Sequence, residues 1–548
     1  MKRIISLIIL ISAGILVLVI PVCGDSFSVY VNGTAWELDH TPIVNLGNVY
    51  LEIKELFALV GRTTIWDADR GVYAAKIGQS SMIYDPNSNT LKKGGQIYYL
   101  AQPPLEVMGS VYVCAREFSQ VLDFSINVDG TKLELNGNLV SQPRKGGYPR
   151  YEIEAIYANG KIFGSEKVTL VNNSNEGVGD LFLVLPAPSI NPQSTTKVFS
   201  VMVDGIPVEF QEGETYLRVV LPQPMEPLEQ CSVEISFDTI VPKGPSRLGY
   251  TEDCAVLSCW YPVVSLDKSV PVYTGFGEPY SFQSGIYTID MTVDRGMQVF
   301  SGLEQVEKKE DRNHTRYKFS SSLPIREAAF VVGQFNVSTV RSGSSTIYYA
   351  YNNYRPKVVK YSAEALEMFG QWWGKYPYPS LTLVEVPLEE FHGMEYGGLI
   401  LLSSINNYDL FTIVHEVAHQ WWQGLVGNNQ ETEAWIDEGL ANYSTLLFLE
   451  SKEGYSGYAS RVKSMENEVG KDFGKLRNSL HDFSSKDEYK KNAYIRGALL
   501  WHEVREQAGR EDLIDFLRSI QEHYKFERIT TEEIIFLLEN AFPGIEGI

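Results

Sequence analysis

The chain has 548 residues, of which 44% are apolar, 12% aromatic and 21% charged. This composition indicates a globular protein rather than a disordered one, and the length predicts three or four domains. The formal net charge is −21 and no basic run follows Met1-Lys2-Arg3, which argues against a nucleic-acid partner because phosphate binding needs clustered Lys and Arg.

The first 24 residues predict export. Lys2 and Arg3 precede an apolar run from Ile4 to Ile20, and Val22-Cys23-Gly24 offers small residues for cleavage. As a helix the run would be about 25 Å long, slightly short of a hydrocarbon core of roughly 30 Å. Residues 1–24 are therefore a signal peptide in the first interpretation and an uncleaved anchor in the second. Both place the rest of the chain outside the cytoplasm, either secreted or attached to the membrane or cell wall.

Residues 25–140 predict a separate unit with an internal repeat at an offset of 62 residues. The recurring residues are Gly47, Val49, Tyr50, Glu55 and Asp67, which return as Gly109, Val111, Tyr112, Glu117 and Asp129. Each copy predicts a short strand, a helical turn and a strand after the Asp. The unit resembles the amino-terminal domain of copper amine oxidases, used as a stalk in bacterial surface proteins. Because it carries no histidine cluster, we expect a spacer or an adhesive module without copper.

Four cysteines follow the first 24 residues, namely Cys114, Cys231, Cys254 and Cys259. An even number is consistent with disulfides in an exported chain, although four are few for this length. Cys254 and Cys259 are the first choice for a pair, and buried thiols are an equal alternative.

A linker near residues 142–147 leads to residues 149–342, where apolar and polar residues alternate. Examples are Tyr151 to Ile156 and Tyr287 to Val293, which predict strands of an antiparallel β domain. Helical periodicity takes over from Pro356. It predicts helices at 358–373, 411–425, 431–443, 493–507, 511–524 and 532–542.

The segment His415-Glu416-Val417-Ala418-His419 carries the chemistry. On a helix, His415 and His419 lie one turn apart on one face, so both imidazoles can bind one ion. Two imidazole nitrogens and a carboxylate oxygen form the ligand set of a catalytic zinc, with the fourth position left to water. Glu416 would lie beside that water and take its proton.

Glu438 supplies the carboxylate nineteen residues after His419, in the sequence Asp437-Glu438-Gly439-Leu440-Ala441-Asn442. It lies on a predicted second helix that follows a Gly427-Asn428-Asn429 turn. Antiparallel packing of the two helices would bring Glu438 over the histidine pair. The sequence therefore predicts one zinc ion held by His415, His419 and Glu438.

Around these residues the chain resembles the aminopeptidase N family of gluzincin zinc metallopeptidases. The resemblance covers roughly residues 150–540 and rests on five motifs in the family's order. The HExxH segment with its following glutamate is one, and the other four are Ala328 to Phe335, Lys375 to Pro379, Phe391-His392-Gly393-Met394-Glu395-Tyr396 and Tyr494-Ile495-Arg496-Gly497-Ala498. The departure is Tyr396, where the family usually has asparagine.

The resemblance implies further site residues. Tyr494 matches the tyrosine that donates a hydrogen bond to the tetrahedral oxyanion, and Tyr489 is a nearby competitor. Glu395 matches the glutamate that binds the substrate's amino terminus, with Gly393 and Met394 beside it in the substrate-binding segment. Gly397 and Gly398 would let substrate backbone approach closely.

These observations predict a multidomain α+β protein: a small repeated α+β unit, an antiparallel β domain and, over residues 343–548, a mainly helical thermolysin-like peptidase domain. The expected function is an exported zinc aminopeptidase acting on peptides. Two alternatives stay open at this point. One is a zinc endopeptidase, because the family's large carboxy-terminal helical domain has no counterpart here and an open cleft would admit long chains. The other is a catalytically idle peptide-binding or adhesive surface protein.

Overall fold

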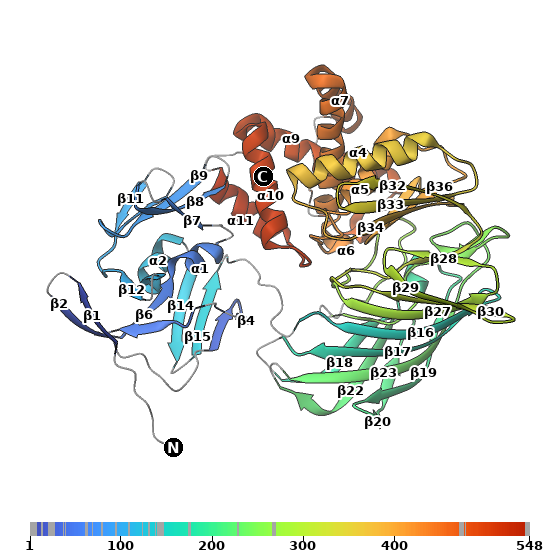
Figure 1. The fold of residues 1–548 in the computed structure, drawn as a ribbon, viewed down its shortest axis with the longest axis horizontal. Coiled ribbons are helices and arrows are strands. Elements are labelled where there is room, and N and C mark those ends of the chain that lie inside the picture. The colour runs from blue at the N-terminus through green and yellow to red at the C-terminus, as the bar shows by residue number, and fades with distance from the viewer. Residues whose placement is uncertain are drawn as a thin grey trace.

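The structure is a computed structural model that describes residues 8–542 apart from short gaps. The gaps fall at residues 13–14, 20–27, 37, 39, 46, 61–63, 68–69, 78–79, 94–95, 108–109, 123, 130–131, 138, 140–146, 174–176, 227–228, 266–269, 471–475 and 477. Figure 1 shows an N-terminal unit in blue, a β unit in teal and green, and a C-terminal unit in yellow to red.

The apolar run near the amino terminus is a hairpin in this structure. Its strands are β1 (Ile8–Ser12) and β2 (Ile15–Val19), which pair antiparallel. The length estimate for a single helix therefore does not apply to the described residues, and the signal peptide and the anchor stay predictions. Ile and Val dominate both strands, and β-branched residues favour extended backbone, so an apolar run alone does not separate the two forms. Among the described residues, no helix is both long enough and apolar enough to cross a membrane.

Among its described residues, the N-terminal unit contains three small sheets and two short helices. Its helices are α1 (Ile53–Ala58) and α2 (Ala115–Leu122). The three sheets have the strand orders β12-β13-β6-β5, β14-β15-β3-β4 and β11-β10-β9-β8-β7. The strands are β3 (Ser28–Val31), β4 (Thr34–Trp36), β5 (Ile43–Asn45), β6 (Asn48–Glu52), β7 (Thr64–Asp67), β8 (Val72–Ile77), β9 (Ser80–Asp85), β10 (Thr90–Lys93), β11 (Gln96–Tyr99), β12 (Leu105–Val107), β13 (Ser110–Cys114), β14 (Phe124–Asp129) and β15 (Lys132–Gly137).

The two copies of the repeat pair with each other through β6 and β13. Their antiparallel register centres on Leu51 opposite Val113, which are equivalent positions of the repeat. The repeated glutamates also accept equivalent hydrogen bonds. Glu55 accepts the backbone N–H of His40 at 2.8 Å, and Glu117 accepts that of the equivalent Gln102 at 3.0 Å. Glu55 and Glu117 therefore recur because each one holds the segment that precedes its own strand and helix.

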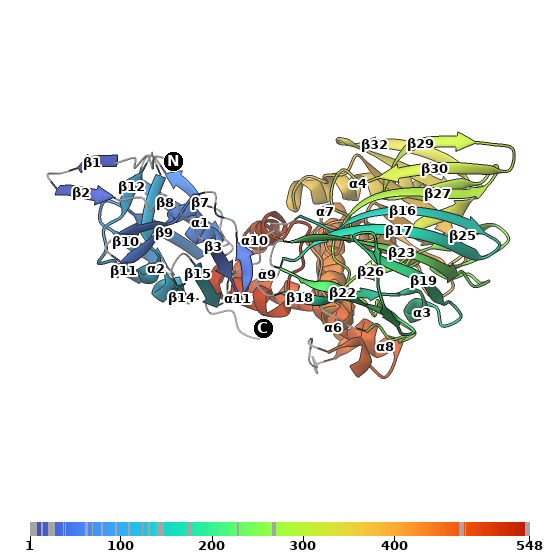
Figure 2. The same cartoon turned by 90° about the horizontal axis from the view of Figure 1, so that it is seen from below.

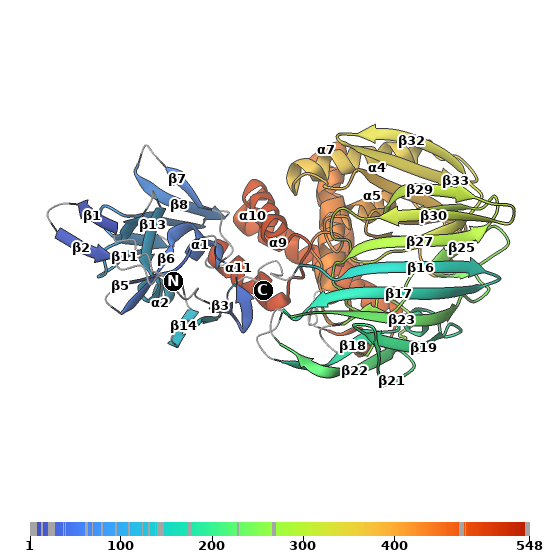
Figure 3. The same cartoon turned by 60° about the horizontal axis from the view of Figure 1, so that its bottom comes forward.

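The β unit is a sandwich built around one large sheet. Its strand order is β20-β19-β23-β17-β16-β27-β30-β29, and Figure 3 shows most of these strands side by side. Two four-stranded sheets, β21-β22-β18-β26 and β24-β25-β31-β28, complete the unit. The elements are β16 (Arg150–Ala158), β17 (Lys161–Val171), β18 (Val178–Val184), α3 (Ala187–Ile190), β19 (Thr196–Val203), β20 (Ile206–Pro207), β21 (Phe210–Glu212), β22 (Tyr216–Met225), β23 (Gln230–Ile240), β24 (Leu248–Tyr250), β25 (Cys254–Leu257), β26 (Val263–Val264), β27 (Ile286–Asp294), β28 (Gln298–Ser301), β29 (Glu304–Glu310), β30 (His314–Ser320) and β31 (Phe330–Gly333).

The alternation of apolar and polar residues identified strands of this unit correctly. Tyr151 to Ile156 lie in β16 and Tyr287 to Val293 lie in β27, and every second side chain of these segments is buried. Most strand pairs are antiparallel as expected, but β16 and β27 pair in parallel. Alternation cannot show this, since both arrangements have the same period of two.

The C-terminal unit places helices around a mixed sheet of order β32-β33-β34-β36-β35. The strands are β32 (Asn336–Ser342), β33 (Ser345–Tyr351), β34 (Ser380–Val386), β35 (Gly393–Tyr396) and β36 (Leu399–Ser403). The helices are α4 (Pro356–Trp372), α5 (Leu410–Ala418), α6 (Gln430–Glu433), α7 (Trp435–Val469), η1 (Leu480–Asp482), α8 (Lys486–Tyr489), the π-helix η2 (Lys490–Arg496), α9 (Gly497–Ala508), α10 (Arg510–His523) and α11 (Thr531–Ala541). Because β32 pairs with β33, this sheet begins at Asn336, a few residues before the expected division at 342.

The N-terminal unit lies against the C-terminal helices. Strand β8 contacts α10, and β9 contacts α11. Figures 1 and 2 show α10 and α11 between the N-terminal unit and the rest of the molecule. The N-terminal unit is thus far along the chain from the HExxH segment but contacts the same folded body.

The four described cysteines, Cys114, Cys231, Cys254 and Cys259, are buried free thiols. Cys254 belongs to an apolar cluster with residues of strands β34, β35 and β36, whereas Cys259 lies in the core of the β unit. The expected Cys254–Cys259 disulfide is therefore wrong in this structure, and the alternative of buried thiols holds.

Candidate active site

The two histidines of the HExxH segment lie at the end of α5. The helix begins at Asp409, whose side chain accepts the N–H of Thr412, and it ends at His419, the C-cap residue. Nε2 of His415 and Nε2 of His419 lie 3.0 Å apart. His419 also donates its Nδ1–H to the carbonyl oxygen of Trp422 at 3.0 Å, which fixes the ring with Nε2 toward His415.

Glu438 lies in the first turn of α7, which packs against α5. Its Oε2 is 3.2 Å from Nε2 of His415 and 3.3 Å from Nε2 of His419. Four ligands placed tetrahedrally at about 2.1 Å from a zinc ion are separated by roughly 3.4 Å. The three side chains therefore fit a zinc ion, and the structure brings them together as the spacing predicted.

Glu416 points toward strand β35 and is buried. A Cβ atom at Gly393 would lie 2.3 Å from Oε1 of Glu416, so any other residue at this position would displace the carboxyl group. Gly393 thus has a packing role, and its expected place in the substrate-binding segment stays a prediction. It makes room for the general base that the sequence predicts.

Glu395 lies on the same face of β35 as Gly393, because alternate residues of a strand face the same side. It is only 9% exposed, and a carboxylate oxygen of Glu395 lies within 4.8 Å of ligand atoms of His419 and Asp437. Met394 faces the other side, where its sulfur accepts a hydrogen bond from Arg247 at 3.8 Å. The structure therefore brings Glu395 to the histidines but directs the Met394 side chain away from them.

Tyr494 stacks on the ring of His415, with centroids 5.7 Å apart and planes at 19°. Its competitor Tyr489 lies behind it, in edge contact with Tyr494 and stacked on Phe276. Tyr494 therefore lies nearer the metal ligands than Tyr489 does, and Tyr489 belongs to the aromatic packing that supports it.

Gly397 and Gly398 serve packing between units. A Cβ atom at Gly302 would lie 1.8 Å from the carbonyl oxygen of Gly397, so the backbone that approaches these glycines is that of Gly302. The expectation that they admit substrate backbone is wrong, because the β unit already fills this space.

A further carboxyl group, Glu278, was missed by the sequence reasoning. It is 5% exposed and interacts electrostatically with Glu395, Glu438 and His419. Arg247 pairs with it and also donates to the carbonyl oxygen of Gly277 at 2.8 Å. The available signal was Gly275-Phe276-Gly277-Glu278-Pro279, where both glycines have positive φ and form a tight turn from the β unit into the site.

Burial is the first influence on every acid at the site. It raises the pKa of Glu416 to about 8 and the pKa of Glu395 well above its usual value. For Glu438, burial is outweighed by His419 and His415, which lower its pKa to about 2. Burial alone would lower the pKa of His419, but the nearby carboxyl groups of Glu395 and Glu438 outweigh it and raise this pKa well above its usual value. A site with this surplus of carboxyl groups favours a cation, either a metal ion or an ammonium group.

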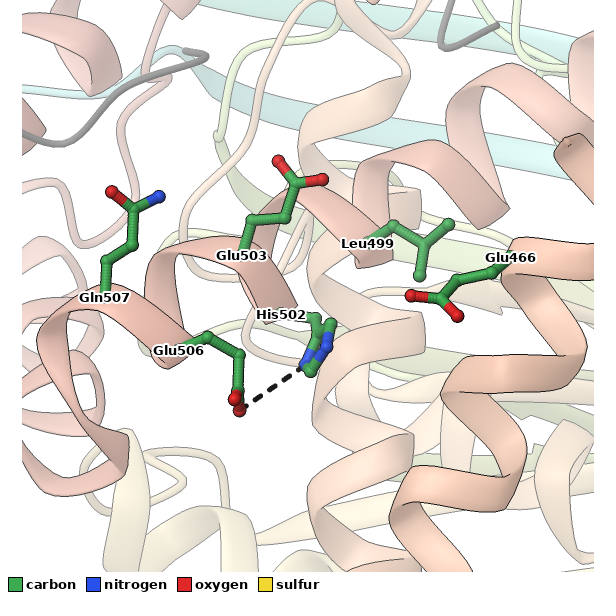
Figure 4. Close-up of a pocket in the computed structure, with 6 residues that line it drawn as sticks. All are labelled: Glu466, Leu499, His502, Glu503, Glu506 and Gln507. Carbon is green, nitrogen blue, oxygen red and sulfur yellow. Dashed lines mark ion pairs between the residues drawn. The ribbon is translucent and has the colours of Figure 1, made fainter. Parts of the chain in front are cut away.

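A separate surface pocket of about 230 Å³ lies between α7 and α9. Figure 4 shows that it is lined by Glu466, Leu499, His502, Glu503, Glu506 and Gln507. Nδ1 of His502 lies 4.0 Å from Glu506 and accepts or donates a bond with Tyr458. None of these lining residues is among the metal-binding, catalytic or substrate-binding residues that the sequence predicts.

Two segments of the chain match known protein families. Residues 358–543 match the Peptidase family M1 domain, and residues 30–136 match the copper amine oxidase N-terminal domain. Both matches confirm the resemblances seen in the sequence.

Among curated relatives, aminopeptidase B of Mus musculus is 25% identical over 276 residues, which cover 45% of this chain and 41% of that protein. A leucyl aminopeptidase of Saccharolobus solfataricus is 22% identical over 319 residues, covering 54% and 38%. The chain thus spans about two fifths of the length of these relatives.

Among solved structures, an M1 zinc metallopeptidase from Deinococcus radiodurans has a TM-score of 0.59 at 18% identity, covering 72% of this chain and 90% of that one. Another structure of an M1 zinc metallopeptidase from that organism holds a Tyr-Ser-Ala substrate, and its TM-score is also 0.59. These likenesses show a shared fold over 72% of this chain.

Proposed function

We propose, from the match of residues 358–543 to the Peptidase family M1 domain, that the protein is a zinc-dependent aminopeptidase that removes amino-terminal residues from peptides. The observation that carries the proposal is that two sets of side chains lie next to each other. One is the His415, His419 and Glu438 ligand set, and the other is the buried carboxyl group of Glu395 beside it. The first suits peptide hydrolysis and the second suits recognition of an ammonium group.

The metal would be held by His415, His419 and Glu438, and when bound it supplies a Lewis acid for the water and the substrate carbonyl. Glu416 accepts a proton from the attacking water and returns it to the leaving amine. The phenol of Tyr494 donates a hydrogen bond to the carbonyl oxygen as negative charge develops there. Each of these groups is anchored on α5, α7 or η2, so little reorganisation is needed during the reaction.

Recognition of the amino terminus falls to Glu395, with Glu278 as a second acid that interacts with it electrostatically. Because Arg247 already compensates the charge of Glu278, Glu395 is the acid left to pair with the substrate's ammonium group. A peptide whose amine is blocked would leave that carboxyl group buried without its cation, at a cost that disfavours binding. Supporting this reading, relatives of the chain carry the name aminopeptidase and a fold neighbour binds a tripeptide.

We also propose that the protein is exported, from Lys2, Arg3 and the apolar run that follows them. Expression of the full chain followed by fractionation and amino-terminal sequencing tests this proposal. A mature chain beginning near Asp25 supports a cleaved signal peptide, and an intact chain in the membrane fraction supports an anchor. An intact chain in the cytoplasm would contradict export.

The proposed activity is tested with purified protein and a panel of amino-acid amides alongside the same compounds with acetylated amines. Turnover of the free-amine compounds alone is the expected result. Turnover of blocked compounds at a similar rate would instead favour the endopeptidase alternative, and a well-folded protein without zinc would favour an idle binding protein.

A further inference from the structure

Asn442 lies one helical turn after Glu438 on α7, so the two side chains project from the same face of the helix. It is 5% exposed. Its Nδ2 donates a hydrogen bond to the backbone carbonyl oxygen of Tyr494 at 3.0 Å. One amide on the metal-ligand helix therefore holds the segment that carries the expected oxyanion donor.

The same side chain lies at the ring of His415. Nε2 of that ring faces His419 and Glu438, whereas its buried Nδ1 has no hydrogen bond of ordinary geometry to any described residue. Asn442 is a neutral side chain that interacts with this ring. The other ligand, His419, has its Nδ1 partner in the Trp422 carbonyl group. A histidine that ligates a metal almost always donates its second ring nitrogen to a partner, and Asn442 is the group in place to accept it.

Two glycines make this arrangement possible. A Cβ atom at Gly439 would lie 2.8 Å from backbone atoms of Gly497, so α7 and the start of α9 touch backbone to backbone. Tyr494 lies just before this contact, in the π-helix η2. Such π-helical turns are frequent at functional sites. The close approach brings the Tyr494 carbonyl group within reach of an asparagine, and it also stacks Tyr494 on His415.

We propose that Asn442 is a positioning residue that links the metal-ligating ring of His415 to the Tyr494 segment. The amide oxygen orients His415 so that Nε2 faces the metal, and the amide nitrogen fixes Tyr494 relative to the same helix. A neutral amide does this without adding charge beside Glu416 and Glu438. The inference rests on the proposed zinc site and adds to it a residue that couples metal binding to placement of the oxyanion donor.

The test compares full-length wild type with N442A, N442D and the control T445V. Thr445 is buried on the same helix, and its hydroxyl group bonds only to the Ala441 carbonyl oxygen of that helix at 2.9 Å. Zinc affinity is measured by competition with a chromogenic chelator, and kcat and KM are measured at saturating zinc. We expect N442A to bind zinc about 10- to 100-fold more weakly than wild type. At saturating zinc its kcat falls while KM changes little.

N442D separates the two bonds, and it preserves the shape of the side chain should N442A fold poorly. The aspartate keeps an acceptor for His415 but loses the donor to Tyr494, so zinc affinity equals or exceeds that of wild type while kcat falls. T445V behaves as wild type in both measurements. A zinc affinity of N442A within twofold of wild type, with unchanged kcat, overturns the inference alone. A wild-type protein that binds no zinc overturns the proposed metal site as well, so the two failures are distinguishable.

Discussion

Two regions of the molecule bury carboxyl groups in opposite ways. In the β unit, Glu166 on β17 is 1% exposed, and neither oxygen has a hydrogen-bond partner among the described residues. In the C-terminal unit, Glu395, Glu416 and Glu438 are equally buried but converge on two histidines. An isolated buried acid keeps its proton and costs stability, whereas several acids around one space create a site for a cation. Convergence of charged groups, rather than burial alone, therefore marks the functional site.

The comparison is tested most severely by Glu416→Gln, which removes the proposed base and keeps the ligands. Turnover should fall by roughly three orders of magnitude or more while zinc stays bound at one ion per chain. The measurements are kcat on an amino-acid amide and metal analysis of the same preparation. Equal activity in a variant with full zinc occupancy would show that the assigned base is wrong.

A smaller effect is expected from Glu395→Ala. Loss of one charge-assisted bond to the substrate amine should lower kcat/KM for free-amine peptides by about 10- to 100-fold. Glu389→Ala is the matched control, because Glu389 is an exposed acid in the connection that leads into β35. Zinc content should not change in either variant. If both substitutions have the same effect on free-amine peptides, Glu395 is an ordinary acid of the site wall.

Glu166→Gln tests the isolated buried acid of the β unit, and the measured quantity is thermal stability. Burial raises the pKa of Glu166 well above its usual value of 4.5, so the folded protein holds a proton that the unfolded chain has lost. The stability contributed by this group is intact below the unfolded pKa and declines as pH rises toward the folded pKa, by about 1.4 kcal/mol per pH unit. The difference between the Tm of the variant and the Tm of wild type should therefore increase, in favour of the variant, by several degrees from pH 5 to pH 8.

Glu152→Gln serves as the control for this measurement, since Glu152 is exposed on the neighbouring strand β16. Its Tm should follow that of wild type across the same pH range. A Glu166 variant that also follows wild type would mean that Glu166 ionises in the folded protein as it does in the unfolded chain.

The smallest effect is expected from deletion of residues 25–140. Every candidate catalytic or binding group, including Glu278, lies after this unit in the chain, so cleavage of small amides should stay within about twofold of wild type. The contacts of β8 and β9 with α10 and α11 make thermal stability the quantity more open to change. A large loss of activity in a folded deletion protein would show that the N-terminal unit contributes to the site.

Much of the site followed from local sequence. The HExxH spacing and Glu438 determine which faces of α5 and α7 meet, because helical periodicity fixes the direction of each side chain. The substrate-binding role of Met394 stays a prediction, although its alternation with Glu395 on β35 places the two side chains on opposite faces. Glu278 had only the signal of the glycine-containing turn that carries it, and Arg247 had none. Both reach the site from parts of the β unit more than one hundred residues away, and only the tertiary fold brings them there.

The fold was predictable where periodicity is strong and local. Strands β16 and β27 were identified, but their parallel pairing joins segments far apart in sequence and leaves no trace in either one. The apolar run near the amino terminus shows the converse limit. Ile and Val occur in both buried helices and strands, so composition did not predict the β1–β2 hairpin.

The central claim is that this site recognises the amino end of a peptide and cleaves the adjoining bond. Mass spectrometry of the products from a peptide of about twenty residues, sampled over the first few turnovers, tests that claim most directly. The account predicts sequential loss of single amino-terminal residues from the free-amine peptide and no cleavage of its acetylated form. Internal fragments as first products, formed equally from both peptides, would contradict it and assign the zinc site to an endopeptidase.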